Sequence, residues 1–295
     1  MSRLRLRVRR TTTLCHMLSS ASSSLVDGGI SATPPPLVPP GRCAFGESFV
    51  AVPLLSREKV NHDCQLLTFG LPTGVNSLGL STCACILARA GDSDTVRPYT
   101  PVSTNAQEGS FDLLVKCYED GNLSKTLGEI PVGDTSISFK HIDFNVKCQY
   151  PFGKKRVGMI AGGTGITPML QALQALISVP GDTTEEIRLI YGNKSSDDIL
   201  ARELLEAWAA RDTRLKVTHV LSEAEEGAVA QGMESGFINA EIIGKHLFTA
   251  PDDDTVLFIC GPPPMYDALC GPRGEKEVGG VLGEMGFRSS HVYKF

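Results

Sequence analysis

The pattern of apolar residues changes near residue 150, and this change limits the chain to a fold of two parts. Before it, short apolar or β-branched runs are separated by Gly, Pro, Asn and Asp, which is typical of strands in an all-β unit. The strand candidates are 49–56, 64–69, 83–89, 97–103, 111–118 and 135–141, with one short helix expected after Asn122. Strands at this spacing predict a small antiparallel β-barrel over residues 45–150.

After residue 150, strand and helix patterns alternate. The strand candidates are 157–161, 187–191, 215–221 and 255–260. A helix is expected directly after Ser196, because Asp197 and Asp198 suit its positive end. The apolar side chains on one face of this helix are Leu200, Leu204 and Trp208. Such alternation predicts an α/β unit with a parallel sheet over residues 151–295.

The first 26 residues have the composition of an organelle transit peptide. They hold five arginines and many Ser and Thr, with no acidic residue before Asp27. We expect import into mitochondria. A plastid address stays open, because apolar residues alternate with arginine at period two instead of forming an amphipathic helix. Residues 27–44, with five prolines among small residues, predict an extended linker.

Charge and composition exclude several classes of function. Without the five arginines of the amino terminus, 23 basic and 33 acidic residues remain, so no nucleic-acid partner is expected. No segment approaches the roughly 18 consecutive apolar residues of a membrane-spanning helix. The nine cysteines and six histidines show no metal-binding spacing, so we expect no bound metal.

The first of three chemical motifs is Arg97-Pro-Tyr-Thr-Pro-Val-Ser. Its two prolines restrict the backbone to extended geometry, which places Arg97 and Tyr99 on one side of a strand. The arginine fork suits a pyrophosphate, and the tyrosine ring can cover a flat heterocycle. Asp120-Gly-Asn-Leu-Ser precedes the short helix, whose backbone N–H groups would hold the same pyrophosphate. Taken alone, these segments are equally explained by an ordinary strand and a hairpin turn.

The second motif, Gly162-Gly-Thr-Gly-Ile-Thr-Pro, follows the strand candidate 157–161. We expect Thr167 to cap the next helix and Pro168 to begin it. The turn would then present amides and the positive end of a helix to a phosphate. The motif meets the dinucleotide pattern GxGxxG only in part, and a structural turn is the alternative.

The third motif is Cys260-Gly-Pro-Pro-Pro-Met. Cys260 ends a strand candidate, and ligands bind at the carboxyl ends of strands in open α/β sheets. Gly261 lets a ligand ring come close, and the prolines fix the turn before a helix near 265–270. A buried structural cysteine is the alternative. Together, the three motifs predict a protein that binds two nucleotides and moves electrons.

The order of these motifs, with Val292-Tyr-Lys-Phe at the end, resembles that of the NADH–cytochrome b5 reductases, a family of ferredoxin reductase-like flavoproteins. The resemblance runs from about residue 49 to residue 295, and segments 139–147 and 150–154 are most similar to mitochondrial-type reductases of plants and algae. It implies that the barrel, 45–150, binds FAD and that the α/β unit, 151–295, binds NADH. It also implies that hydride passes from NADH to FAD, and that single electrons pass on to cytochrome b5 or a similar small haem protein.

The resemblance further implies roles for individual residues. Those expected to line the FAD site are Arg97, Pro98, Tyr99, Thr100, Ser103, Lys116, Gly121, Asn122, Leu123, Ser124 and Thr167. Those expected to line the NADH path are Gly163, Thr164, Gly165, Cys260, Gly261, Pro262 and Met265. The residues expected at the reaction centre are Cys260, Lys116 and Thr100. Cys260 would shape and polarise the nicotinamide site without acting as a nucleophile, and Lys116 or a backbone N–H group would stabilise negative charge on the reduced flavin.

Two positions depart from the family pattern. Where many members carry Gly-Gln-His, this chain has Cys83-Ala-Cys. Where many animal members carry an aspartate that helps to reject the extra phosphate of NADPH, this chain has Ser222. Three glutamates follow directly, at positions 223, 225 and 226, and their charge would still repel that phosphate. We therefore expect a preference for NADH.

Two alternatives stay open on the sequence alone. One is a related reductase that serves nitrate reductase, an oxygenase or a ferredoxin, and the other is a non-catalytic nucleotide-binding protein on the same scaffold. No cytochrome domain or iron–sulfur motif is fused to this sequence, which favours a stand-alone reductase, expected to be a monomer. Lys125, Lys154 and Lys155 are expected to form a basic patch that docks the acidic face of cytochrome b5, with a solvated charged surface as the alternative.

Overall fold

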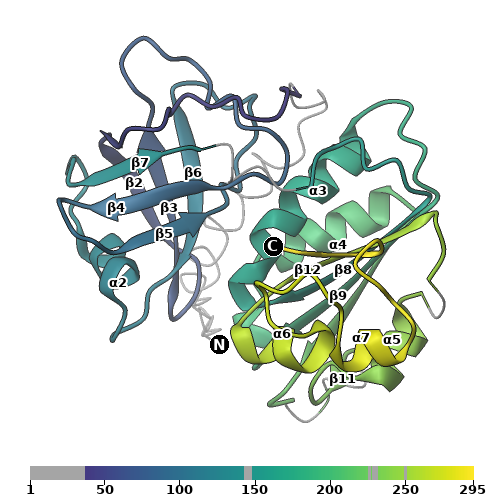
Figure 1. Ribbon diagram of the computed structural model, residues 1–295. Coiled ribbons are helices and arrows are strands. Elements are labelled where there is room, and N and C mark those ends of the chain that lie inside the picture. The colour runs from purple at the N-terminus through teal and green to yellow at the C-terminus, as the bar shows by residue number, and fades with distance from the viewer. Residues whose placement is uncertain (1–36, 143–147, 225–226, 228–231, 249–250) are drawn as a thin grey trace, which may run out of the picture.

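The computed structural model describes residues 37–142, 148–224, 227, 232–248 and 251–295. Within them the chain forms two domains side by side, with antiparallel sheets in the first and a parallel sheet in the second (Figure 1). The predicted boundary near residue 150 falls between the last strand of the first domain and the first strand of the second. The predicted transit peptide, and the predicted linker as far as residue 36, lie outside the described residues.

The first domain is built from two antiparallel sheets, with strand orders β1-β7-β4-β5 and β2-β3-β6. Its elements are β1 (Val50–Ala51), β2 (Leu54–Lys59), β3 (Cys64–Gly70), β4 (Ile86–Ala90), β5 (Val96–Tyr99), β6 (Ser110–Lys116), α2 (Asn122–Glu129) and β7 (Ile137–Lys140). The predicted strand 49–56 is divided into β1 and β2 at Pro53, because proline has no N–H group to donate to a sheet. The predicted antiparallel β fold is confirmed.

Four phenylalanines form the core between these two sheets. Phe45, Phe69, Phe111 and Phe139 are buried, and their ring centroids lie 5.0–5.8 Å apart, mostly edge to face. Such aromatic pairs stabilise a core beyond the area that they bury. Strand β7, which carries Phe139, pairs with β4, and β4 in turn pairs with β5, the strand that carries Arg97 and Tyr99.

The second domain is a six-stranded sheet of order β11-β10-β9-β8-β12-β13, in which every pair is parallel. Its strands are β8 (Arg156–Gly162), β9 (Glu186–Asn193), β10 (Leu215–Leu221), β11 (Glu234–Ser235), β12 (Thr255–Cys260) and β13 (Val292–Lys294). Its helices are η2 (Gly163–Gly165), α3 (Ile166–Ser178), η3 (Ser196–Asp198), α4 (Arg202–Arg211), α5 (Ala240–His246), α6 (Pro263–Cys270) and α7 (Gly280–Glu284). The α/β prediction is confirmed, although the short edge strands β11 and β13 were not predicted.

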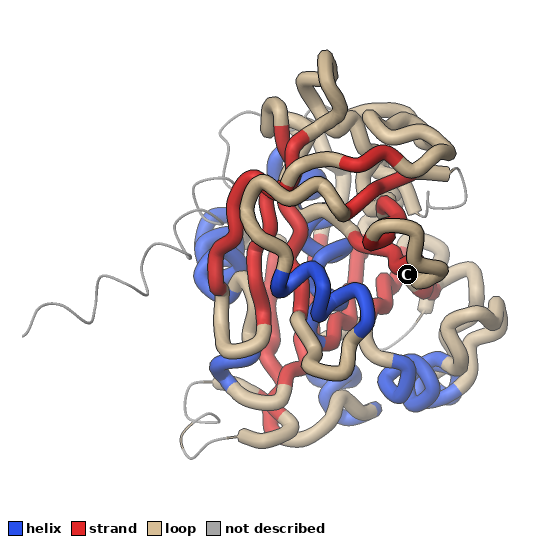
Figure 2. Tube along the Cα trace, turned by 90° about the vertical axis from the view of Figure 1, so that its left-hand side faces the viewer, coloured by secondary structure: helices blue, strands red, loops and turns tan. Residues whose placement is uncertain are grey.

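Helices cover both faces of the parallel sheet. Side chains of α3 and α4 pack with Met159 on one face, and side chains of α5, α6 and α7 pack with Ile160 on the other. Parallel strands buried on both faces are nearly continuous apolar runs, as β8 and β12 are here after their first residues, Arg156 and Thr255. In Figure 2, which views the molecule from the left-hand side of Figure 1, the strands of the first domain lie in front.

Two details of the helices differ from the sequence prediction. The helix expected after Ser196 begins only at Arg202, because residues 196–198 form the 3₁₀ turn η3 and Ala201 has a left-handed φ of 55°. The predicted cap at Thr167 was wrong. Helix α3 begins at Ile166 with Gly165 as its N-cap, and Thr167 lies within the helix, where its hydroxyl donates to Thr164 O at 3.1 Å. Among the described helices, none is long and apolar enough to cross a membrane.

Candidate active site

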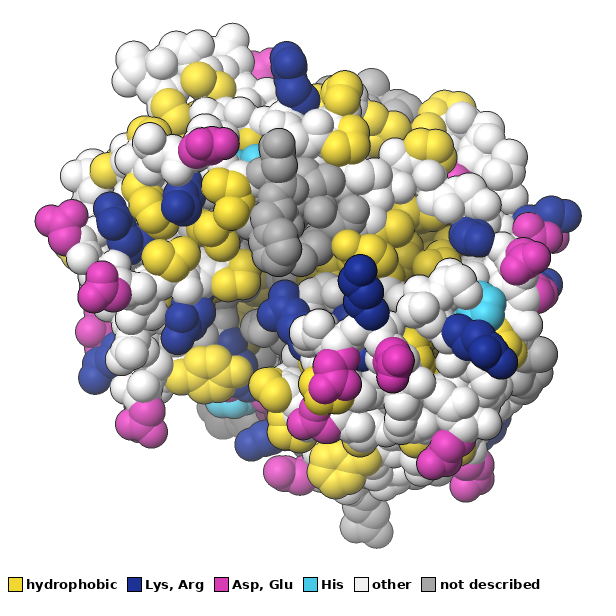
Figure 3. All heavy atoms as spheres, viewed as in Figure 1, with side chains coloured by type: hydrophobic (Ala, Val, Ile, Leu, Met, Phe, Trp, Pro, Cys, Tyr) yellow, Lys and Arg dark blue, Asp and Glu magenta, His cyan; other side chains and the backbone are white. Residues whose placement is uncertain are grey.

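A pocket of about 1130 Å³ is lined by residues of both domains and lies at the carboxyl ends of β8, β9, β10 and β12. This is the edge of an open α/β sheet where ligands bind. Basic and hydrophobic side chains are interspersed on both sides of the boundary between the domains (Figure 3). The pocket is therefore the candidate active site.

The first domain contributes a cationic and aromatic wall. Arg97 is exposed on β5, and its guanidinium donates to Val96 O at 2.9 Å through one Nη, which leaves the other donors to face a ligand. Tyr99 is half-buried beside it, and burial raises the pKa of its phenol to about 12, so the phenol is neutral near pH 7. Thr100 and Lys116 line the same wall.

Three helices begin at this pocket, and none of them has an acidic residue in its first turn. They are α2, α3 and α6, and their N-caps are Gly121, Gly165 and Pro262. By contrast, α4 and α5, whose residues do not line the pocket, carry Glu203 and Glu241 in their first turns. The positive ends of α2 and α3 are thus left for anions to neutralise, as the phosphates of two nucleotides would. Helix α6 differs, because Pro263 and Pro264 have no N–H group and the Met265 N–H donates to Pro262 O.

The turn 162–168, here called the glycine turn, and the turn 260–265, here called the Cys260 turn, are packed directly on each other. A Cβ placed on Gly165 would lie 2.1 Å from Cys260 O, and a Cβ placed on Gly261 would lie 3.3 Å from Gly162 N. Gly163 has a φ of 52°, which favours glycine, and a Cβ there would meet nothing within 4 Å. The glycines therefore allow the two turns to meet, with open space beside Gly163 for a flat ring.

Cys260 sits at this junction as a neutral thiol. Burial raises its pKa to about 11, and the hydrogen bond with Tyr266 opposes the rise. The Tyr266 hydroxyl donates to Phe295 O at 2.6 Å and lies 3.2 Å from Ile259 O. A protonated, partly buried thiol shapes and polarises a ring site but is a poor nucleophile, which fits the role expected from the sequence.

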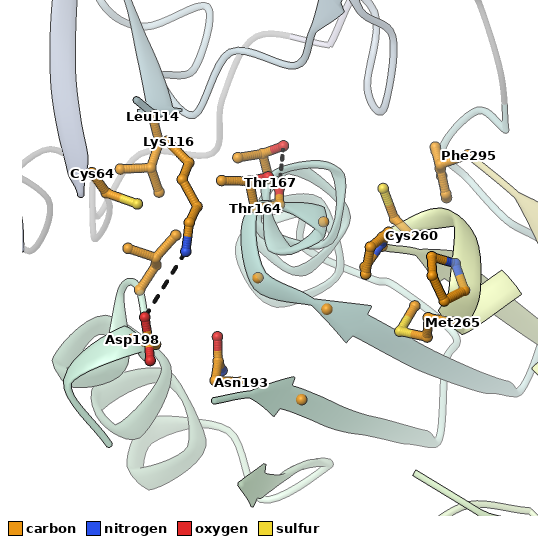
Figure 4. Close-up of a pocket in the computed structure, with 18 of the residues that line it drawn as sticks. Cys64, Leu114, Lys116, Thr164, Thr167, Asn193, Asp198, Cys260, Met265 and Phe295 are labelled. Carbon is orange, nitrogen blue, oxygen red and sulfur yellow. Dashed lines mark hydrogen bonds and ion pairs between the residues drawn. The ribbon is translucent and has the colours of Figure 1, made fainter. Parts of the chain in front are cut away.

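Lys116 projects from the end of β6 into the pocket (Figure 4). Its Nζ lies 2.5 Å from Asp63 Oδ2 and 3.9 Å from Asp198 Oδ1. Burial by itself would lower the pKa of Lys116, but the hydrogen bond and the charge of Asp63 raise it, so the ammonium stays charged. The aspartates offset part of this positive charge in the site.

The pocket brings together almost every residue that the sequence singled out. The residues that line it are Arg97, Pro98, Tyr99, Thr100, Lys116, Gly121, Asn122, Leu123, Ser124, Gly163, Thr164, Gly165, Thr167, Cys260, Gly261, Pro262 and Met265. Ser103 is not among them, because its hydroxyl accepts a hydrogen bond from Asp112 N at 2.9 Å. The individual binding roles of these residues stay predictions.

Some residues that line the pocket were not predicted. A sequence pattern could have identified only part of them. Asn193 ends β9, so the rule that ligands bind at strand ends could have found it. Phe237 and Arg273 lie in loops that no motif marks. Ser222 and Glu223 line the pocket as the argument on NADPH requires, whereas the glutamates at 225 and 226 lie outside the described residues.

The lysines expected to dock a partner do not form one patch. Lys125 lies on α2, beside the pocket. Lys154 and Lys155 precede β8, whose opposite end lines the pocket, and the seven residues of this strand span about 20 Å. Lys155 pairs with Glu185 at 3.3 Å, and Lys154 donates to Asp253 O. The prediction of a single patch was wrong, because a parallel strand places its two ends on opposite edges of the sheet.

Comparison with known proteins identifies both halves of the chain. Residues 51–141 match the oxidoreductase FAD-binding domain, and residues 159–271 match the oxidoreductase NAD-binding domain. The fold, the uncapped helix ends and these matches define an FAD- and NAD-binding oxidoreductase. The residues of the pocket fit both cofactors, since the donor set suits phosphates and the open space beside Gly163 suits a ring.

Relatives from fungi and an amoeba give the family. NADH-cytochrome b5 reductase 2 of Scheffersomyces stipitis is 36% identical over 258 residues, covering 85% of this chain and 84% of the relative. NADH-cytochrome b5 reductase 1 of Dictyostelium discoideum is 39% identical over 238 residues, covering 80% and 78%. The cytochrome b5 reductase domain of Ulva prolifera nitrate reductase superposes with a TM-score of 0.70 at 34% identity, covering 86% of this chain and 97% of that domain. The chain belongs to the NADH–cytochrome b5 reductase family.

Proposed function

We propose that this protein oxidises NADH at the pocket between its domains and passes the electrons singly to cytochrome b5 or a similar small haem protein. The observation that carries the proposal is the meeting of two nucleotide sites in one pocket. The glycine turn and the Cys260 turn form one wall, and β5, Lys116 and the start of α2 form the other. The name shared by the relatives supports cytochrome b5 as the acceptor.

The side chains of the pocket have two roles, to hold the cofactors and to align their rings. FAD, when bound, supplies the chemistry that accepts two electrons as hydride and releases them one at a time. Arg97 and the amides at the start of α2 hold its pyrophosphate, and Tyr99 covers a flat ring. Gly163, with no Cβ, leaves room for the nicotinamide, and the Cys260 thiol stays protonated beside it. Lys116 supplies positive charge to the site.

A second acceptor is suggested by one comparison. The similarity to the reductase domain of Ulva prolifera nitrate reductase supports an acceptor domain of that enzyme's kind as an alternative to free cytochrome b5. The two candidates are separated by the rate constants for reduction of each purified acceptor. A rate with cytochrome b5 that is no faster than with an unrelated haem protein would favour the alternative.

We further propose that the protein is a mitochondrial reductase of the plant and algal type, that it acts as a monomer, and that its first 26 residues are a transit peptide. The five arginines and the lack of acids before Asp27 support import. Fusing residues 1–44 to a fluorescent protein tests whether this segment directs import into mitochondria. Replacing its first five arginines with glutamine serves as the control. Fluorescence that stays in the cytosol or enters plastids would refute the mitochondrial assignment.

The absorption spectrum of the purified protein tests the core of the proposal. We expect bound flavin with a visible spectrum that NADH bleaches, and reduction of cytochrome b5 that depends on NADH. Ferricyanide, a small acceptor that needs no docking surface, serves as the control. Bleaching by NADH without reduction of any haem protein would leave a nucleotide-dependent flavoprotein and contradict the proposed acceptor.

A further inference from the structure

A polar bridge joins the two domains beside the pocket. We call it the inter-domain bridge. It consists of Asn61, His62, Asp63 and Lys116 of the first domain and Asp197 and Asp198 of the second. Asn61 Nδ2 donates to Asp197 O at 3.0 Å, and Lys116 lies between the carboxylates of Asp63 and Asp198. The bridge thus anchors η3 to the ends of two strands of the first domain.

Asp198 divides its two carboxylate oxygens between the domains. Oδ2 accepts hydrogen bonds from Ser195 N at 3.0 Å and from Ser195 Oγ at 2.8 Å, which closes the capping box of η3. Oδ1 lies 3.9 Å from Lys116 Nζ (Figure 4). The same oxygen lies 3.6 Å from His62 Nε2. The side chains of Lys116 and Asp198 are 23% and 11% exposed, so their pairing is only partly screened by solvent, whereas His62 is 60% exposed. One carboxylate therefore fixes its own turn and points it at the first domain.

The bridge holds its own cation. His62, Asp63 and Asp198 place ligand atoms within 4.8 Å of one another, as a metal site would. The Lys116 ammonium, 2.5 Å from Asp63, supplies the positive charge that these carboxylates require. We therefore read the cluster as an ion-pair contact between domains.

Tyr191 connects this bridge to the glycine turn. Its ring is fully buried between the sheet and α4, and its hydroxyl donates to Gly163 O at 3.0 Å. The same hydroxyl accepts from Leu200 N at 3.3 Å, two residues beyond Asp198. Gly163 O also accepts from the backbone N–H of Ile166, at the start of α3. A chain of contacts thus runs from Lys116 through Asp198, Leu200 and Tyr191 to the glycine turn.

We propose that Asp198 and Tyr191 are positioning residues, which align the glycine turn with the FAD-binding wall. Asp198 lines the pocket and would act through its contacts with Lys116 and Ser195, whereas Tyr191 does not line the pocket. The proposal rests on the hydride-transfer function proposed above. Transfer requires the two rings to be held to within a fraction of an ångström, and a misplacement of about 1 Å can cost on the order of 100-fold in rate. Lys116 occurs in both the bridge and the pocket, so the contact that joins the domains also orients a side chain of the site.

Asp198→Asn tests the bridge with little change in shape. The amide oxygen can still accept from Ser195, but the charge that faces Lys116 is lost. We expect the limiting rate of flavin reduction by NADH to fall about tenfold, with FAD content and melting temperature close to the parent's. The matched control is Asp197→Asn, since Asp197 is exposed and contributes only its main-chain oxygen to the bridge. We expect this control to behave as the parent.

A readout besides turnover separates alignment from damage. Loss of the bridge should loosen the domains, so trypsin should release domain-sized fragments of Asp198→Asn faster than of Asp197→Asn. Equal fragmentation and equal limiting rates for both variants would overturn the role of Asp198. A parent protein that NADH does not reduce would instead refute the proposed function and leave the proteolysis comparison intact.

Tyr191→Phe tests the connection to the glycine turn, because it keeps the ring and removes only the hydroxyl. We expect faster hydrogen–deuterium exchange at the Ile166 amide and a limiting rate about three- to tenfold lower, in line with the loss of one hydrogen bond. Tyr150→Phe is the control, since it removes a similar phenol bond, to Asp182 at 2.8 Å, away from the pocket. The double variant Tyr191→Phe, Asp198→Asn should lose less than the sum of the two effects. Additive losses, or exchange equal to that of the control, would refute a shared path.

Discussion

Replacing Gly165 with alanine offers a sharp test of how the two turns make the site. Gly165 has a φ of −62° and a ψ of −6°, which alanine adopts without strain. The added Cβ, however, would lie 2.1 Å from Cys260 O, 2.5 Å from Cys260 C and 2.9 Å from Gly261 N. All three neighbours are backbone atoms, so no side chain can rotate away. The glycine turn and the Cys260 turn would have to separate.

The size of the effect follows from these distances. Real Cβ contacts are almost never shorter than 3.0 Å, so the turns must move apart by about 1 Å. Overpacking of this kind costs about 1–3 kcal/mol of folding free energy. A shift of about 1 Å in the Cys260 carbonyl also displaces the nicotinamide wall, and such misplacement can slow a reaction on the order of 100-fold. We expect loss of rate to exceed what the loss of stability explains.

The assay combines thermal unfolding with stopped-flow reduction of the flavin by NADH. Two glycine variants serve as controls. Gly244→Ala, inside α5 with nothing within 4 Å, should raise stability by about 0.5–1 kcal/mol and leave the rate unchanged. Gly181→Ala, at a φ of 79° in a turn outside the pocket, should cost about 1–2 kcal/mol and also leave the rate unchanged. A Gly165→Ala protein with the parent's melting temperature and rate would refute the packing argument.

Four further outcomes are expected. Arg97→Ala should lose FAD on extensive dialysis, because a charged phosphate contact contributes about 1.5–3 kcal/mol, and full retention would contradict its role. Cys260→Ala should slow flavin reduction by NADH in stopped-flow at unchanged FAD content, whereas equal rates would make the cysteine a packing residue. The fold raises the pKa of Cys260 from 9.0 to about 11, so the contribution of its protonated thiol to stability is complete below pH 9 and is lost between pH 9 and 11. The melting temperature of the parent should therefore fall across that range, and Cys260→Ala should make the fall smaller. NADH should exceed NADPH in kcat/KM, and Glu223→Gln should narrow the difference; the opposite ranking would remove the role given to that glutamate.

The sequence predicted those parts of the fold that depend on local periodicity. Alternation of apolar strands and helices after residue 150 identified the parallel sheet, and the three motifs identified most of the pocket, because their glycines and prolines are local determinants of backbone shape. Errors arose where a single backbone angle decided the outcome. Ala201 interrupts the expected helix with a φ of 55°. Cys83, the first residue of the predicted strand 83–89, has a φ of 60°, and the strand begins only at Ile86. Neither alanine nor cysteine favours a left-handed backbone conformation, so the sequence does not predict it.

Long-range pairs were beyond the reach of sequence patterns. From its sequence neighbours, Asp198 was predicted only to stabilise the positive end of a helix. In the structure one of its oxygens faces Lys116, 82 positions earlier in the chain. Ser103 belongs to a motif expected to bind FAD, but its hydroxyl is taken by the backbone of β6. These choices depend on which elements pack together, and that is decided by the tertiary structure.

The contact between the domains uses apolar and polar groups for different purposes. Cys64, Cys83 and Leu114 belong to the first domain by sequence, but they are buried in the core of the second, against α3 and the sheet. Gln171 of α3 adds two hydrogen bonds across the boundary, from Cys83 N at 2.6 Å and to Pro101 O at 2.7 Å. Apolar burial is not directional, so it can hold the domains together without fixing their angle. Directional contacts, those of Gln171 and of Asp198, are then required to set the angle at which the two nucleotide sites face each other.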